Sequence, residues 1–130
     1  MISVGRDDVL RGLKRFRRLA KQDILASPYA QDPDYWNAQA EARRAVYGEL
    51  AEIVEREGVE AAYRRAIDGY TALPLLRAGG SPEIAGKERA FEMFFSLLGL
   101  DPKQVTRLRN SRRRISPPPR GGRSVARAGG

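Results

Sequence analysis

Residues 81–114 read SPEIAGKERAFEMFFSLLGLDPKQVTRLRNSRRR, and this stretch predicts an apolar helix, a tight break and a strongly basic second helix. Ser81 and Pro82 indicate where the first helix begins, because a hydroxyl can cap free amides and a first-position proline needs no donor. The apolar residues that follow recur at steps of three and four: Ile84, Phe91, Phe94, Phe95 and Leu98. This spacing places them on one helix face, which is expected to pack into a hydrophobic core.

The break between the two helices has its own signals. Gly99 suits the left-handed backbone position that follows a helix end. Asp101, Pro102 and Gln104 then supply a cap, a first-turn proline and the reciprocal side chain of a capping box. Two apolar residues of the second helix are expected to face inward, Val105 and Leu108. The packed first helix is therefore predicted to hold a basic second helix at the surface.

Composition argues against most catalytic chemistry. The 130 residues include no cysteine and no histidine, which removes disulfides, thiolate metal sites and histidine-based triads. No glycine-rich phosphate loop, nucleotide fingerprint or nucleophile beside a base is present in the sequence. We therefore expect no enzyme, no cofactor and no metal.

Apolar runs are short throughout the sequence. None approaches the roughly 20 residues of a membrane span, and the start MISVGRDD lacks the apolar core of a signal peptide. A cytoplasmic protein without a membrane partner is expected.

The net charge of +8 is unevenly distributed. Residues 1–26 contain seven basic and three acidic side chains, residues 27–100 contain eight and twelve, and residues 101–130 contain nine and one. A basic excess at both ends of an acidic middle suggests local sites for an acidic partner. The final segment, ISPPPRGGRSVARAGG, is rich in proline and glycine, so it is predicted to form a disordered tail.

Nucleic acid is the partner that this charge pattern favours, with duplex DNA preferred over RNA. The second helix and the tail supply the candidate contact residues, which are Lys103, Gln104, Arg107, Arg109, Arg112, Arg113, Arg114, Arg120, Arg123 and Arg127. Arginine and lysine at this density can neutralise phosphates and release counterions. Phosphate contacts are therefore expected to dominate the affinity.

Residues 7–26 predict an amphipathic helix. Its apolar face comprises Val9, Leu10, Leu13, Phe16, Ala20 and Ile24. The remaining surface carries a second basic face, made of Arg11, Lys14, Arg15, Arg18 and Lys21. Two interpretations are favoured: this face is an ordinary solvated surface, or it follows a nucleic-acid backbone. A helix on a membrane surface is a weaker third, because the apolar face is modest and lacks tryptophan.

Residues 33–57 predict a helix of about 37 Å that begins at the Asp32 cap and Pro33. Residues at alternating steps of four and three form a heptad-like seam: Trp36, Ala40, Arg43, Tyr47, Leu50 and Val54. The helix is longer than a domain of this size needs, so part of the seam is expected to pack against another copy of the chain. Trp36 is interpreted as a core or interface anchor in preference to a platform for exposed bases.

A further helix is predicted from Val59 to Leu73, between Gly58 and Pro74. The predicted fold is thus a small all-α bundle of four to five helices in residues 1–114. The disordered basic tail follows in residues 115–130.

The segment FFSLLGLDPKQVTRLRN, residues 94–110, resembles a helix-turn-helix of the bacterial repressor kind. Gly99 matches the turn glycine, and Val105 and Leu108 match the apolar contacts of the recognition helix. The resemblance implies that five residues face the major groove, namely Lys103, Gln104, Thr106, Arg107 and Arg109. Phe95 departs from the pattern, which has a small residue four positions before the turn glycine.

A longer segment, AYRRAIDGYTALPLLRAGGSPEIAGKERAFEMFFSLLGLDPKQVTRLR, residues 62–109, resembles the C-terminal part of phage terminase small subunits of the P27 type. The shared features are a tyrosine-containing helix, a glycine-containing loop, another helix, and Gly99, Leu100 and Pro102 before a short arginine-rich helix. The resemblance implies an all-helical, ring-forming, non-enzymatic subunit that binds viral DNA and presents it to a large motor subunit.

The predicted function is therefore that of a non-enzymatic DNA-binding protein of phage or mobile-element type. A homo-oligomeric component of DNA packaging fits both the charge pattern and the longer resemblance. Three alternatives remain: a helix-turn-helix transcriptional regulator, an RNA-binding helper, and an adaptor whose basic tail docks an acidic protein.

Overall fold

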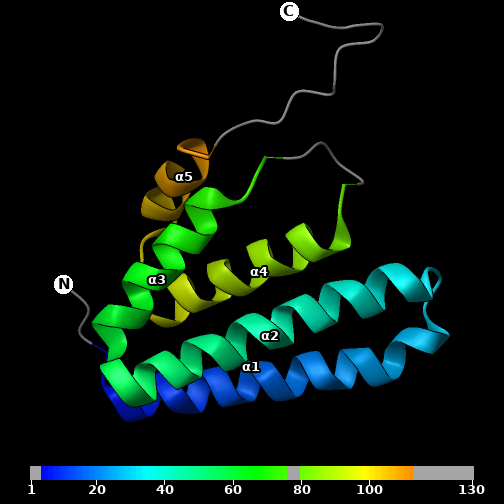
Figure 1. Cartoon of the computed structure of the whole chain (residues 1–130), viewed down its shortest axis with the longest axis horizontal. Coiled ribbons are helices and arrows are strands. Elements are labelled where there is room, and N and C mark those ends of the chain that lie inside the picture. The colour runs from blue at the N-terminus through cyan, green and yellow to red at the C-terminus, as the bar shows by residue number, and fades with distance from the viewer. Residues whose placement is uncertain (1–3, 76–79, 113–130) are drawn as a thin grey trace, which may run out of the picture.

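A computed structural model describes residues 4–75 and 80–112 of the chain (Figure 1). These residues form five α-helices and one short 3₁₀ helix, and they contain no strand. The elements are α1 (Arg6–Ala26), η1 (Ser27–Tyr29), α2 (Pro33–Glu57), α3 (Val59–Ala72), α4 (Pro82–Leu97) and α5 (Pro102–Asn110). The predicted all-α bundle of four to five helices is confirmed.

The predicted tail, residues 115–130, and the predicted boundary after residue 114 lie outside the described residues. Within the described ranges, none of the helices combines the length and the apolar character that crossing a bilayer requires.

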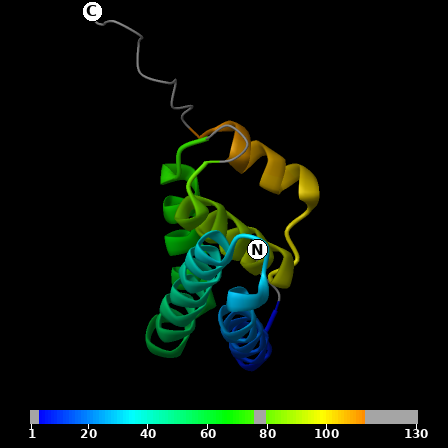
Figure 2. The ribbon, with the colours of Figure 1, turned by 90° about the vertical axis from the view of Figure 1, so that its right-hand side faces the viewer.

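The bundle is built on a long helical hairpin. α1 and α2 run antiparallel along one side, and η1 makes the reversal between them (Figure 1). α4 packs against α2, with Gly86 so close to Gln39 that a Cβ at position 86 would collide with the backbone of α2. α3 and α5 lie farther from α1, and α5 rests against α3 and α4 on the side of the bundle opposite α1 (Figures 1 and 2).

Two of the predicted caps begin their helices as expected. The Asp32 carboxylate accepts a hydrogen bond from the Tyr35 amide at 3.3 Å, and the Ser81 hydroxyl accepts one from the Ile84 amide at 3.3 Å. Proline follows each cap, at a position where the missing amide hydrogen costs nothing. Local side-chain chemistry therefore sets the starts of α2 and α4.

The boundaries of α5 and the end of α2 also follow the sequence. The Asp101 carboxylate accepts from the Lys103 amide at 2.8 Å, while the Gln104 side chain accepts from the Asp101 amide at 2.9 Å. Gly58 and Gly99 have φ angles of 98° and 85°, in the region where a residue with a Cβ is strained. The chain can therefore turn sharply after α2 and after α4.

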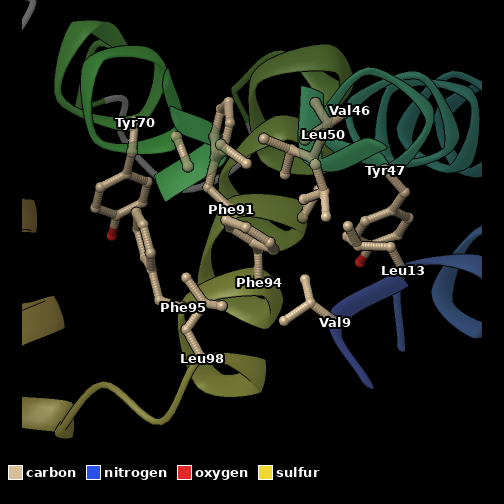
Figure 3. Close-up of a cluster of buried hydrophobic side chains, with 14 of the residues drawn as sticks. Val9, Leu13, Val46, Tyr47, Leu50, Tyr70, Phe91, Phe94, Phe95 and Leu98 are labelled. Atoms are coloured by element: carbon tan, nitrogen blue, oxygen red, sulfur yellow. The ribbon is translucent and has the colours of Figure 1, made fainter. Parts of the chain in front are cut away.

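One hydrophobic core joins α1, α2, α3 and α4 (Figure 3). Its largest fully buried side chains are Tyr70, Phe94, Phe95, Leu13, Leu50, Val9 and Val54. The Tyr70 and Phe95 rings meet edge to face, with centroids 5.4 Å apart at 88°, a geometry that aromatic quadrupoles favour. The predicted apolar faces of residues 7–26 and 81–98 are thus confirmed as core surfaces, except that Ile24 is half-buried and lies outside the core cluster.

The seam on α2 is covered by the chain's own helices. Four of its members are at most 2% exposed: Ala40, Tyr47, Leu50 and Val54. The Tyr47 ring packs against Phe16 of α1, with centroids 5.3 Å apart. These four residues are therefore not available to another copy of the chain, because a heptad pattern identifies an inward stripe but not the helix that fills it. Of the seam, Trp36 remains 47% exposed, and the packing of another copy against it stays a prediction.

Candidate nucleic-acid interface

α5 brings four of the predicted contact residues to the surface, and Arg109 is the one with acidic neighbours. Lys103, Gln104 and Arg107 are exposed, but the Gln104 carbonyl oxygen is engaged by the Asp101 amide in the capping box. Neither Lys103 nor Arg107 forms an ion pair with another residue that the structure describes. α5 therefore presents two cations that are available to a ligand.

Arg109 is half exposed but has acidic neighbours. One of its terminal nitrogens lies 3.4 Å from the Glu92 carboxylate and 3.6 Å from that of Glu88. A phosphate would have to compete with two carboxylates for this guanidinium. Arg109 is therefore a weaker contact candidate than Arg107.

Arg112 is buried, which contradicts its predicted role as a nucleic-acid contact. Its side chain is 1% exposed. Nε donates to the Leu73 carbonyl at 3.0 Å, Nη2 donates to the Pro74 carbonyl at 2.8 Å, and Nη1 pairs with Glu88 at 2.5 Å. The guanidinium also lies 4.9 Å from the Tyr70 ring centroid, within cation–π range. Arg112 instead fastens the end of α5 to the end of α3.

Tyr70 adds a second polar link beneath this arginine. Its hydroxyl donates a hydrogen bond to Glu92 at 2.8 Å. Burial, followed by the hydrogen bond to Glu92, raises the pKa of Tyr70 to about 12, although Arg112 acts in the opposite direction. The hydroxyl therefore stays protonated at neutral pH and can donate to Glu92. The Tyr70–Glu92 and Arg112–Glu88 contacts together hold α3, α4 and the end of α5 against one another.

We call α5 and the residues that follow it the C-terminal basic segment. Its remaining predicted contact residues are Arg113, Arg114, Arg120, Arg123 and Arg127. They lie outside the described residues.

The second predicted basic face is exposed on α1. We call it the α1 basic face, and it consists of Arg11, Lys14, Arg15, Arg18 and Lys21. Its positions recur at three and four, so these side chains project from one side of the helix, opposite the buried Val9, Leu13 and Ala20. Arg11 pairs with Asp8. The other four cations have no carboxylate partner among the described residues.

Arg17 is an exposed cation of α1 that the sequence interpretation did not include. It lies beside Gly48 of α2, toward the flank of the hairpin. The sequence signal that could have identified Arg17 is its position within the run of basic residues from Arg11 to Lys21.

The two basic surfaces face different directions. α1 and α5 lie on opposite sides of the bundle, with α3 and α4 between them (Figures 1 and 2). A straight duplex that lies along the exposed side of α1 therefore cannot contact α5 at the same time.

The α4–α5 pair has some features of the helix-turn-helix pattern. Gly99 has the positive φ that the turn requires, and Val105 and Leu108 are partly buried against the core. Phe95 packs toward Tyr70 of α3 and is fully buried, so a bulky residue is accommodated there. The helix-turn-helix interpretation stays a prediction.

No carboxylate cluster suited to a metal ion is found in the described ranges. Comparison of the chain with protein-family models, with curated proteins and with solved structures finds no match.

Proposed function

We propose that this chain is a non-enzymatic nucleic-acid-binding protein that holds duplex DNA mainly through its phosphates. The observation that carries the proposal is the α1 basic face, where Lys14, Arg15, Arg18 and Lys21 are exposed on one helix side without a carboxylate partner in the described residues. Buried or paired arginines elsewhere stabilise the fold, whereas these four cations form no ion pair with the residues that the structure describes.

The dimensions of this face suit a nucleic-acid backbone. Lys14 and Lys21, the first and last of the four unpaired cations, are seven residues apart, which corresponds to roughly 10 Å along α1 at 1.5 Å per residue. Each DNA strand carries a phosphate for every 3.4 Å of duplex axis, so about three phosphates of one strand lie within this length. Four unpaired cations therefore face a comparable number of phosphates along the contact.

Neutralising the α1 basic face should remove most of the salt dependence of DNA binding. With four phosphate contacts, the plot of log affinity against log salt has a slope of about −4, from roughly 0.9 per contact. The combined variant Lys14→Gln, Arg15→Gln, Arg18→Gln and Lys21→Gln is expected to reduce the magnitude of the slope by between three and four. Titration of one labelled duplex at several salt concentrations measures the change.

A charge-matched control separates a site from net charge. Arg56, Arg64, Arg65 and Lys87 are exposed cations on other helices, and Arg64 and Arg65 pair with Glu60 and Glu49. Changing these four to glutamine lowers the net charge equally but should leave the slope within about one of the parent. Equal losses in both variants, or a parent slope of zero, would contradict the proposal.

The C-terminal basic segment is the second candidate surface. The observation that favours it is the pair of available cations on α5, Lys103 and Arg107. If the quadruple α1 variant keeps the parent slope, the principal contact belongs to this segment and the α1 assignment is wrong.

A packaging-type role is proposed in preference to transcriptional regulation. Its support is the resemblance of residues 62–109 to P27-type terminase small subunits. Such a component would be a homo-oligomer that works with a motor subunit. A particle mass equal to one chain in light scattering at tens of micromolar would oppose this role.

Replacing Gln104 and Arg107 with alanine distinguishes the two roles. In a regulator these residues contact base edges, where a bidentate contact provides about 1 to 3 kcal/mol of discrimination. In a packaging component, the double variant should lose the same modest affinity on several unrelated duplexes. Loss confined to one preferred duplex would support the helix-turn-helix regulator.

A further inference from the structure

The turn of the α1–α2 hairpin carries the large apolar side chains that the fold leaves exposed. In the described part of the chain these are Leu19, Leu25, Tyr29 and Trp36, which keep between 44% and 90% of their surface in contact with solvent. All four fall within an eighteen-residue stretch around η1. Contiguous exposed apolar surface marks contact sites, whereas singly scattered residues do not, and Trp36 is the member of this group that lines a pocket.

Trp36 lines a pocket at this end of the molecule. The pocket has a volume of about 390 Å³ and is bounded by α1, η1, α2 and α4, with Asp23, Gln39, Arg43 and Arg89 among its lining residues. This size lies within the range of small-ligand sites. Trp36 offers the pocket an aromatic surface that remains 47% exposed.

The polar lining of the pocket favours an anionic ligand. Arg43 pairs with Asp23 at 2.7 Å and donates to the Gln39 side chain at 2.8 Å, so the Asp23 charge is already compensated. Arg89 is exposed and has no ion-pair partner among the residues that the structure describes. One uncompensated guanidinium therefore stands in the same pocket as the indole of Trp36.

The pocket continues the line of the α1 basic face. Arg15 and Ala26 are eleven residues apart, which is three helical turns, so they lie on the same side of α1 about 16 Å apart. The exposed Leu19 lies between them, and Ala26 lines the pocket. An extended ligand that contacts Arg15 can therefore also reach Trp36 without crossing the bundle.

We infer that the Trp36 pocket receives an unpaired base of single-stranded nucleic acid whose phosphates lie along the α1 basic face. Sites for single strands combine a basic track with aromatic side chains on which bases stack. Arg89 supplies a cation for the phosphate beside the stacked base, and this charge argues for a nucleic acid over a neutral apolar partner. The inference rests on the proposed function, because it uses the same basic face.

Trp36 is the only tryptophan in the chain, so its fluorescence reports on this pocket alone. The full chain is titrated with a twelve-nucleotide thymidine strand, with an abasic strand of equal length, and with a blunt duplex. The thymidine strand should quench Trp36, because its bases are free to stack. The abasic strand and the duplex should bind with salt-dependent affinity but cause little quenching.

A substitution series measures the contribution of stacking. Trp36→Leu should weaken binding of a labelled thymidine strand about thirtyfold, which is the middle of the range for losing one stacked base. Trp36→Phe should restore part of that loss, while affinity for the abasic strand and the duplex stays unchanged in both variants. Tyr29→Leu is the matched control, since Tyr29 is more exposed than Trp36 but is not among the pocket residues. Unchanged thermal melting shows that Trp36→Leu is folded.

The failures of the two proposals are distinguishable. Absence of salt-dependent binding to all three ligands overturns the proposed function and this inference together. Equal affinity for the three ligands without quenching overturns the inference alone. A blue shift of Trp36 emission with vesicles of anionic lipid, but no response to the thymidine strand, would assign the pocket to a membrane surface and also overturn it. A dimer in light scattering that Trp36→Leu converts to monomers would likewise overturn the inference.

Discussion

Leu50→Glu is expected to unfold the chain, and not merely to separate subunits. Leu50 is fully buried on α2, within the core that α1 and α4 complete (Figure 3). A carboxylate there has no described cation to pair with in the apolar cluster, and it must either ionise in a poorly solvating environment or take up a proton. Together with the lost apolar contacts, the cost should exceed about 5 kcal/mol, which is comparable with the whole stability of a small domain.

Circular dichroism and urea titration test this result. The variant should show no cooperative unfolding transition at neutral pH, whereas the parent should. Leu25→Glu is the matched control, because Leu25 is 67% exposed on α1, and it should change the free energy of unfolding by no more than about 0.5 kcal/mol. A Leu50→Glu protein that melts like the parent but has a smaller particle mass would mean that Leu50 belongs to a subunit interface.

Helix boundaries could be predicted because their causes are local. The bounds of α2, Pro33–Glu57, agree with the sequence prediction at both ends. The Asp32 carboxylate reaches an amide only three residues away, and Gly58 adopts a positive φ that glycine tolerates. Interactions that close within one helical turn can be identified without knowing the rest of the fold.

The partners of charged side chains could not be predicted in the same way. Arg112 follows Arg107 and Arg109 in a basic run, and sequence alone gives all three the same properties. The structure separates them because Arg112 meets groups from positions 24 to 39 residues earlier in the chain. The partners of the α2 seam could not be predicted for the same reason. Its apolar pattern shows which side of α2 faces inward, but only the folded structure shows that α1 and α4 pack against that side.

Pairing also explains why α1 replaces α5 as the leading candidate surface. Sequence places more cations near the C-terminal end than on α1, which favoured the C-terminal segment. In the fold, Glu88 and Glu92 of α4 reach Arg109, and Glu88 also reaches Arg112. Cations that compensate nearby carboxylates contribute less to binding phosphate than unpaired ones do.

Arg112→Ala should detach the C-terminal end of α5 and lower the free energy of unfolding by about 2 to 4 kcal/mol. The substitution leaves the Leu73 and Pro74 carbonyls without their donor and leaves Glu88 without its closest cation. Removing one partner of a fully buried ion pair costs about 3 to 5 kcal/mol, and the partial exposure of Glu88 lowers that figure. The cation–π contact with Tyr70 is lost as well.

Two measurements separate the local from the global effect of this change. Urea unfolding gives the loss of stability, and amide hydrogen exchange across Pro102–Asn110 shows whether α5 opens independently, since exchange protection reports local unfolding. Arg109→Ala removes an equivalent side chain that shares Glu88 with Arg112 and also contacts Glu92, but Arg109 is half exposed, so the change should cost less than about 1 kcal/mol. Arg112→Lys should fall between the two, because an ammonium keeps the charge near Glu88 but cannot reproduce the three directed contacts of the guanidinium. Equal losses for Arg109→Ala and Arg112→Ala, with α5 exchange unchanged in both, would show that Arg112 does not anchor the helix.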